Sequence, residues 1–112
     1  MRKILIAMFV FVSCFTTKAF SDGHSIKMGI ILGFTGPIES LTPAMRDSAK
    51  MAFQEASDSG SLLGGETITV VEGDSTCVDS AAAQAAAEKL VSEGVAAIMG
   101  ADCSGVTGAI AT

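Results

Sequence analysis

The stretch from Gly100 to Gly105 holds the residues best suited to bind a small ligand. It follows an apolar run and leads into an expected helix, whose first backbone N–H groups have no partner within the helix and favour an anion. The hydroxyl of Ser104 adds a hydrogen-bond donor at the same place. A carboxylate or a phosphate would fit this pattern. The alternative is that Ser104 only caps the helix, as serine often does, and the residues alone leave both interpretations open.

Cys77 and Cys103 are the next residues with possible chemistry. A disulfide between them would close a loop and stabilise the fold by about 3.5 kcal/mol on the chain-entropy model. The alternative is a catalytic or metal-binding thiol. The sequence has one histidine, His24, near the N-terminus, so neither a Cys-His dyad nor a four-ligand zinc site can be assembled convincingly. We therefore expect a disulfide, no metal and no cofactor.

Three enzyme signatures fail on individual residues. Segment 100–107 matches a phosphate-binding loop at its glycines and at Thr107, but Val106 stands where the lysine that reaches the phosphates is needed. The glycines that follow the first apolar run do not form the Gly-x-Gly-x-x-Gly fingerprint of dinucleotide-binding proteins. Neither Ser104 nor Cys103 has glycines two residues away on both sides, as a nucleophile elbow requires. We predict that the chain is not an enzyme.

Residues 1–21 have the pattern of a cleavable secretory signal peptide. Two basic residues precede an apolar run over residues 4–12, and small residues at positions 19 and 21 mark a cleavage site before Asp22. As a helix the apolar run covers about 14 Å, less than half of the roughly 30 Å hydrocarbon core, which disfavours a transmembrane anchor. A second alternative is processing at Cys14, which would give a lipid-anchored protein. We predict a periplasmic protein that starts at Asp22.

The chain after the leader is acidic. Three of the seven Lys and Arg residues leave with the leader and all twelve Asp and Glu residues stay, which gives a formal balance of −8. Nucleic acid is therefore not an expected partner. Glu72 and Asp74 are interpreted as solvated charges at the rim of the fold rather than as an acid and base pair. An oxidising compartment would permit the disulfide between the two cysteines. We expect the protein to be a monomer.

Alternating strands and helices must position these residues. The strands are short apolar or β-branched runs typical of a buried parallel sheet, at residues 26–32, 67–71 and 95–99. The order is β-α-β-α-β-α, an α/β, Rossmann-like parallel sheet with helices on both faces. Ligands of such sheets bind beyond the carboxyl ends of the strands, here at loops 33–41, 73–79 and 100–105. Uncovered sheet edges indicate that residues 22–112 are part of a longer protein; the alternative is a complete miniature domain.

Helical spacing of apolar and small residues predicts three helices. The first has Thr42 as its N-cap and Pro43 as its first residue, and it ends near Gly60. Its expected inner face consists of Ala44, Met45, Ala49, Ala52, Phe53 and Ala56. The second runs from Ser80 to Glu93 and is capped by Asp79 or Ser80, and the third starts at Val106. The expected inner face of the second is Ala83, Ala86, Ala87, Leu90 and Val91.

Several sequence features occur in a specific order. The strand at residues 26–31 is followed by Thr-Gly-Pro at 35–37, an acidic loop carries Cys77, and Cys103 and Ser104 follow a glycine. In order and spacing they resemble the N-terminal lobe of the extracellular substrate-binding proteins of branched-chain amino acid ABC transporters. The resemblance extends over essentially the whole chain after the leader. It implies the type I periplasmic binding protein fold, two Rossmann-like lobes of which this chain holds part of the first, and a disulfide between the two cysteines.

The resemblance also implies roles for single residues. Ser104 would bind the α-carboxylate of the ligand through its hydroxyl and backbone N–H. Gly105 and Thr107 beside it are further candidate ligand-binding residues. Leu41 is a candidate at the mouth of the cleft, where some members place an aromatic side chain. Because the chain has no Tyr or Trp, an aromatic pocket wall is expected from outside it.

The implied mechanism is capture without chemistry. The first lobe holds the carboxylate, the second closes over the rest of the ligand, and the closed protein docks on ABC permease subunits in the membrane. We predict the periplasmic substrate-binding component of an ABC transporter that imports branched-chain or related aliphatic amino acids. The alternatives are a ligand-sensing domain of the same fold, for an amide or an amino acid, and an exported α/β hydrolase. The hydrolase would need a histidine and an acid from beyond Thr112.

Overall fold

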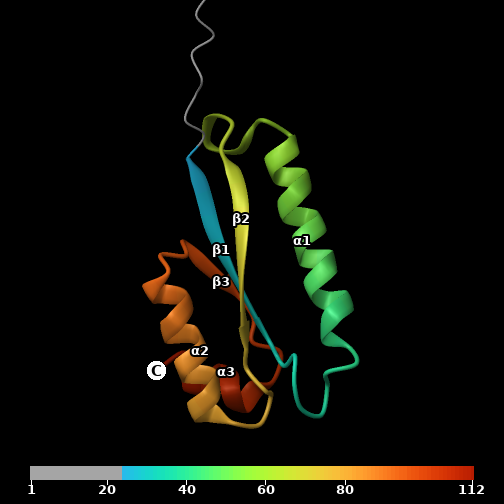
Figure 1. Ribbon diagram of the computed structural model, residues 1–112, viewed down its shortest axis with the longest axis vertical. Helices are drawn as coiled ribbons and strands as arrows, with labels where there is room; N and C mark the ends of the chain where they lie inside the picture. Colours follow the sequence, from blue (N-terminus) through green and yellow to red (C-terminus); the bar gives the residue numbers. More distant parts are fainter. Residues whose placement is uncertain (1–23) are drawn as a thin grey trace, which may run out of the picture.

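The computed structural model describes residues 24–112, so the predicted leader and Cys14 lie outside the described residues. Strands and helices alternate along this range (Figure 1). They are β1 (Ser25–Leu32), α1 (Thr42–Asp58), a 3-10 helix (Leu62–Gly64), β2 (Thr67–Asp74), α2 (Ser80–Ser92), β3 (Ala97–Met99) and α3 (Ser104–Ile110). The predicted β-α-β-α-β-α order is confirmed, and the short 3-10 helix between α1 and β2 is an addition to it.

The sheet has the strand order β2-β1-β3, and both pairings are parallel, as predicted. The register of β1 and β2 runs from Ser25 opposite Thr67 to Leu32 opposite Asp74. β2 extends to Asp74, beyond the predicted strand at residues 67–71, because residues 72–74 still pair with β1. β3 begins at Ala97 rather than at position 95, because the chain before it completes the end of α2: the N–H of Val95 bonds to the carbonyl of Leu90.

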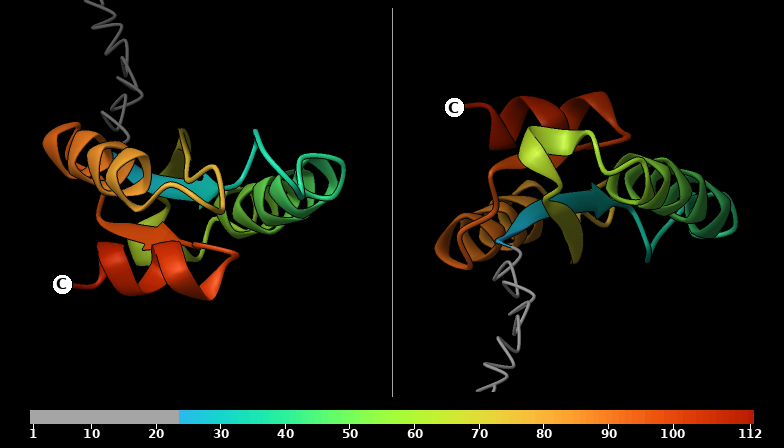
Figure 2. Two further views of the ribbon diagram at one scale, coloured as in Figure 1. Left: turned by 90° about the horizontal axis from the view of Figure 1, so that it is seen from below. Right: turned by 90° about the horizontal axis from the view of Figure 1, so that it is seen from above.

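Helices cover both faces of the sheet, as predicted. α1 lies on one face and α2 on the other, and α3 packs against α2 (Figure 2). The central strand β1 is buried most deeply: Ile30, Ile31 and Leu32 are at most 1% exposed. Ile31 forms the centre of the core with Ala87 and Leu90 of α2. A strand that is buried on both sides and apolar without alternation is typical of the middle of a parallel sheet.

The prediction for α1 is wrong in two respects. Of its residues only Thr42 is fully buried. On the expected inner face, three residues are half-buried (Ala49, Phe53 and Ala56) and three are exposed (Ala44, Met45 and Ala52). Thr42 is also not the N-cap: Leu41 occupies that position, and the Thr42 hydroxyl lies within hydrogen-bond distance of the Gly33 carbonyl, at 3.2 Å. Thr42 is the first residue of the helix rather than the residue before it, and its hydroxyl proton points to carbonyl oxygens outside the helix. Thr42 therefore joins α1 to the end of β1.

α2 follows its prediction closely. Asp79 is the N-cap, and its Oδ1 accepts hydrogen bonds from the N–H groups of Ala81 and Ala82, at 2.9 and 3.0 Å. The predicted inner residues Ala83, Ala87 and Leu90 are buried. Val91 is wrong, because it is 65% exposed. One residue along a helix rotates the side chain by about 100°, which turns Val91 away from the face that Leu90 buries.

The part of the chain that the structure describes contains no helix with the length and apolar character needed to cross a membrane. Within the same residues, 24–112, no group of three or more His, Cys, Asp or Glu side chains is arranged to hold a metal ion.

Candidate functional site

Three loops meet where the strands end, at the lower end of the molecule in Figure 1. They are residues 33–41 after β1, 75–79 after β2 and 100–103 after β3, which we call loops 1, 2 and 3. Loop 1 lies directly against loop 2 at Gly36, which has a φ of +99°. A Cβ atom at Gly36 would collide with the backbone carbonyl oxygen of Thr76, so this approach requires glycine. The predicted ligand-binding edge of the sheet is thus one continuous set of loops.

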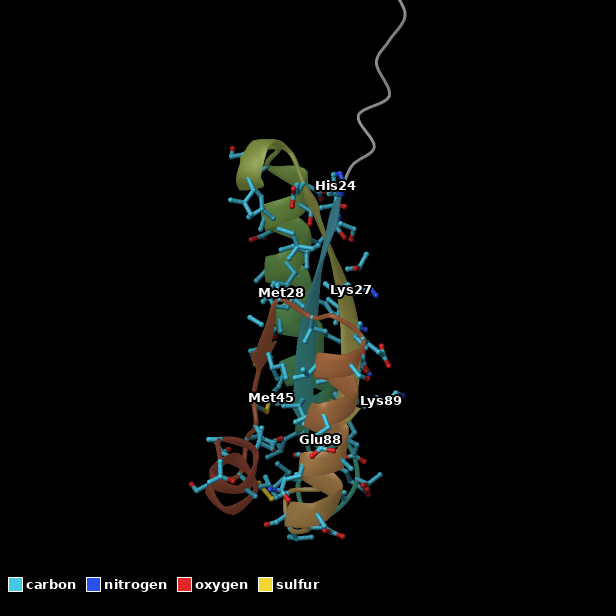
Figure 3. The ribbon with its side chains drawn as sticks, turned by 90° about the vertical axis from the view of Figure 1, so that its left-hand side faces the viewer. His24, Lys27, Met28, Met45, Glu88 and Lys89 are labelled. Carbon is cyan, nitrogen blue, oxygen red and sulfur yellow. A yellow bond between two sulfur atoms is a disulfide. The ribbon has the colours of Figure 1, made fainter. Side chains whose placement is uncertain are left out.

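A disulfide between Cys77 and Cys103 joins loops 2 and 3. The pairing expected from the sequence is confirmed, and it bridges 26 positions of the chain. Cys103 is also the N-cap residue of α3 and lies directly before Ser104. His24 is at the start of β1, at the opposite end of the sheet (Figure 3). A bonded sulfur without a histidine nearby is not a nucleophile, so the disulfide is structural.

Asp102 connects loop 3 to the other two loops. Its Oδ2 accepts a hydrogen bond from the backbone N–H of Gly33 at 2.8 Å, and its Oδ1 accepts one from the hydroxyl of Ser75 at 3.3 Å. Ser75 is fully buried, and its own N–H donates to the carbonyl of Leu32 at 2.9 Å. The ends of β1 and β2 and the loop before α3 are therefore joined through one carboxylate.

Asp74 binds loop 1 to loop 2 in a similar way. Its Oδ2 accepts from the Thr35 hydroxyl at 2.6 Å, and its Oδ1 accepts from the N–H of Thr76 at 2.8 Å and of Thr35 at 3.3 Å. Partial burial acts to raise the pKa of Asp74, but the hydrogen bonds from Thr35 and Thr76 outweigh it and hold the pKa below its usual value. Asp74 is therefore a carboxylate at the rim of the fold, as expected, and in addition it joins loop 1 to loop 2.

The structure places Ser104 and Gly105 at the exposed start of α3. The helix begins two residues earlier than Val106, so Ser104 is its first residue and not its cap. Among the described residues, the Ser104 hydroxyl has no hydrogen-bond partner that would occupy it. The N–H groups of the first helical turn also have no acceptor within the helix. These neutral donors lie together at the sheet edge, which is the arrangement that a carboxylate would need.

Thr107 and Leu41 lie beside this edge in different situations. The Thr107 hydroxyl is 2.9 Å from the carbonyl of Cys103 and 3.2 Å from that of Ala101, so its single proton is shared with loop 3. This contact fixes loop 3 from the side of the helix. Leu41 is the N-cap residue of α1 at the end of loop 1 and is 61% exposed. It presents an apolar surface to solvent without a partner in the described part of the chain.

Phe34 is an aromatic residue on loop 1 that the sequence reasoning missed. It directly follows Gly33 and is partly buried, with the guanidinium of Arg46 6.0 Å from its ring centre. Such a cation over an aromatic ring contributes about 0.5–1 kcal/mol at an exposed site. The sequence signal for Phe34 was its position in the loop that directly follows the first apolar strand, where ligand-binding residues are expected. An aromatic side chain is therefore present on loop 1.

The charged residues of the three loops themselves are acidic. Loops 1, 2 and 3 contain Glu39, Asp79 and Asp102 but no Lys or Arg. On α1, Arg46 forms an ion pair with Asp47 at 2.8 Å, and Lys50 pairs with Glu72 of β2. An anionic group at this edge would be bound by N–H and O–H donors rather than by a basic residue of the loops.

The structure has a separate hollow away from the candidate loops. A cavity of about 470 Å³ lies between α2, β3 and α3, and it is lined by Gln84, Ala87, Glu88, Val91, Ser92, Ile98, Ala109, Ile110 and Thr112. None of the predicted ligand-binding residues lines it. We assign the candidate site to the loops, because the convergent hydrogen-bond donors are there.

The family model of the periplasmic binding proteins matches residues 25–112. The chain belongs to the periplasmic binding protein family. The match includes every described strand and helix, all three loops and the disulfide. Proteins of this family bind ligands and are generally not enzymes. A search of curated proteins found no match to the chain.

Proposed function

We propose that this chain belongs to the periplasmic substrate-binding component of an ABC transporter and helps to capture branched-chain or related aliphatic amino acids for import. The observation that carries the proposal is the position of Ser104 in a periplasmic binding protein. Its hydroxyl is exposed at the start of α3, directly after the disulfide that fixes Cys103. Ser104 and the N–H of Gly105 would bind the α-carboxylate. Leu41 and Thr107 would border the bound ligand.

The charges at the sheet edge favour an amino acid over a simple anion. A phosphate dianion would meet the field of Asp74, Asp79 and Asp102 without a basic residue from the loops. A zwitterion also carries an ammonium group, which these carboxylates attract. A net-neutral ligand with one carboxylate therefore fits this acidic edge better than phosphate does, which supports an amino acid as the ligand.

The leader at residues 1–21 supports a location in the periplasm. Cleavage before Asp22 would release residues 22–112 as the start of the mature protein, and the Cys77–Cys103 bridge fits an oxidising compartment. Processing at Cys14 would instead give a lipid-anchored form. Mass spectrometry of the mature N-terminus distinguishes the two: a start at Asp22 supports the free form, and an acylated Cys14 contradicts it.

Calorimetric titration of the full-length protein with L-leucine tests the ligand proposal. We expect Ser104→Ala to weaken binding about tenfold or more, because a hydrogen bond to a charged group contributes about 1.5–3 kcal/mol. Ser48→Ala is the matched control, since Ser48 is an exposed serine of α1 whose hydroxyl donates to the Ala44 carbonyl. Unchanged affinity of the Ser104 variant would remove this residue from the site.

The role in import needs a second test in cells. We expect deletion of the gene to reduce uptake of radiolabelled leucine, and the Ser104→Ala gene to restore less uptake than the wild-type gene. Uptake that is unaffected by the deletion, together with tight leucine binding in vitro, would favour the sensing domain over the transport component.

A further inference from the structure

Asp102 makes contacts that the proposed function does not use. Its two carboxylate oxygens face different strands: Oδ2 binds the N–H of Gly33 after β1, and Oδ1 binds the hydroxyl of Ser75 after β2. Gly33 and Asp102 are 69 positions apart in the sequence. The contacts therefore arise from the tertiary fold and not from a local turn.

Both partners of Asp102 depend on its carboxylate because they are buried. Gly33 and Ser75 are both buried, and leaving a buried donor without an acceptor costs free energy. The hydrogen bond to the Gly33 N–H is also charge-assisted, which makes it stronger than one between neutral groups. Loss of the carboxylate would free the start of loop 1 from loop 3.

Asp102 also lies only two residues before Ser104. The next residue, Cys103, is fixed to loop 2 by the disulfide, and the Thr107 hydroxyl contacts the carbonyls on both sides of Asp102. The disulfide and the threonine hold loop 3 to loop 2 and to its own helix. Among the hydrogen bonds and ion pairs of residues 24–112, only the bond between the Gly33 N–H and Asp102 joins loop 3 directly to loop 1.

We propose that Asp102 is a positioning residue of the ligand site. It fixes the position of loop 1 relative to Ser104, and loop 1 and Ser104 form the two sides of the proposed carboxylate site. This inference rests on the proposed function, because a change at Asp102 can affect ligand binding only if the ligand binds at Ser104. Asp102 itself does not contact the ligand.

The test compares Asp102→Ala and Asp102→Asn in the full-length protein. Amide hydrogen exchange of Gly33, followed by NMR, reports the contact directly, and calorimetry with L-leucine reports its consequence. We expect Asp102→Ala to accelerate Gly33 exchange and to weaken leucine binding about tenfold, the size of a hydrogen bond to a charged group. Asp102→Asn keeps an oxygen that can accept from Gly33, so we expect it to restore slow exchange and most of the affinity.

Asp58→Ala is the control, because Asp58 is a carboxylate at the end of α1 that accepts a hydrogen bond from Gln54 and has no contact with Gly33. Gly33 exchange and leucine affinity should stay near wild type in this variant. Slow Gly33 exchange in Asp102→Ala would overturn the inference, as would a loss of affinity no larger than that of Asp58→Ala. If the wild-type protein binds no leucine, the proposed function fails, and Gly33 exchange still decides whether Asp102 positions loop 1.

Discussion

Removal of the disulfide should lower the stability of the protein by an amount that the loop length sets. Cys77 and Cys103 enclose α2 and β3 and are 26 positions apart. For a loop of this length, the chain-entropy model gives about 3.5 kcal/mol at 25 °C. The free energy of unfolding of a small domain is about 5–15 kcal/mol, so this loss would be a large part of the total. The Ser75–Asp102 hydrogen bond joins the same two loops without the bridge, so we expect the fold to persist.

Urea unfolding followed by circular dichroism measures this loss. The double variant Cys77→Ser/Cys103→Ser should unfold roughly 1–3 M below the oxidised wild type, given slopes of about 1–3 kcal/mol per molar urea. Dithiothreitol should lower the wild-type midpoint to the same value and leave the double variant unchanged, which is the control. If the double variant unfolds within about 0.3 M of the oxidised protein, the bridge does not restrict the unfolded chain as the loop length requires, and the reasoning is refuted.

Two further changes test the acidic network and the core. The pKa of Asp74 is lowered in the folded protein, so its stabilising effect is fully present above its unfolded pKa of about 3.9 and is lost as the pH falls through the lower folded value. The difference in urea midpoint between wild type and Asp74→Asn should therefore shrink from pH 6 towards about pH 3, and a constant difference would contradict this. Leu90→Ala should cost about 2–5 kcal/mol of unfolding free energy because Leu90 is 1% exposed. Val91→Ala, at a side chain that is 65% exposed, should change it by less than about 0.5 kcal/mol, and equal losses would show that the core assignment is wrong.

Local signals were sufficient to predict much of the fold. The apolar run that ends at Leu32 predicts a buried strand, and β1 is the central strand. Asp79 predicts a helix start, because a carboxylate before a run of alanines has a simple local partner in the free N–H groups. The disulfide was predictable because Cys77 and Cys103 are the two cysteines of this sequence that follow the predicted leader.

The contacts that build the candidate site were less predictable because they depend on strand order. The Thr35 partner of Asp74 is 39 positions away, and the sequence alone does not show that the two meet. On α1, the alanine pattern suggested a buried face, but Arg46 and Lys50 reach Glu72 of β2 from the same helix. Long basic side chains cover apolar surface with their stems, so residue type alone does not identify the packed face.

The central position of β1 has a consequence for the order of folding. β1 is the first described strand to be synthesised, but its neighbours in the sheet, β2 and β3, follow much later in the chain. Contacts between distant segments form slowly, because the entropy of closing the intervening chain is lost before the contact is gained. One edge of β1 therefore stays unpaired until the segment from Ala97 to Met99 reaches it, which lengthens the time during which the folding chain remains open.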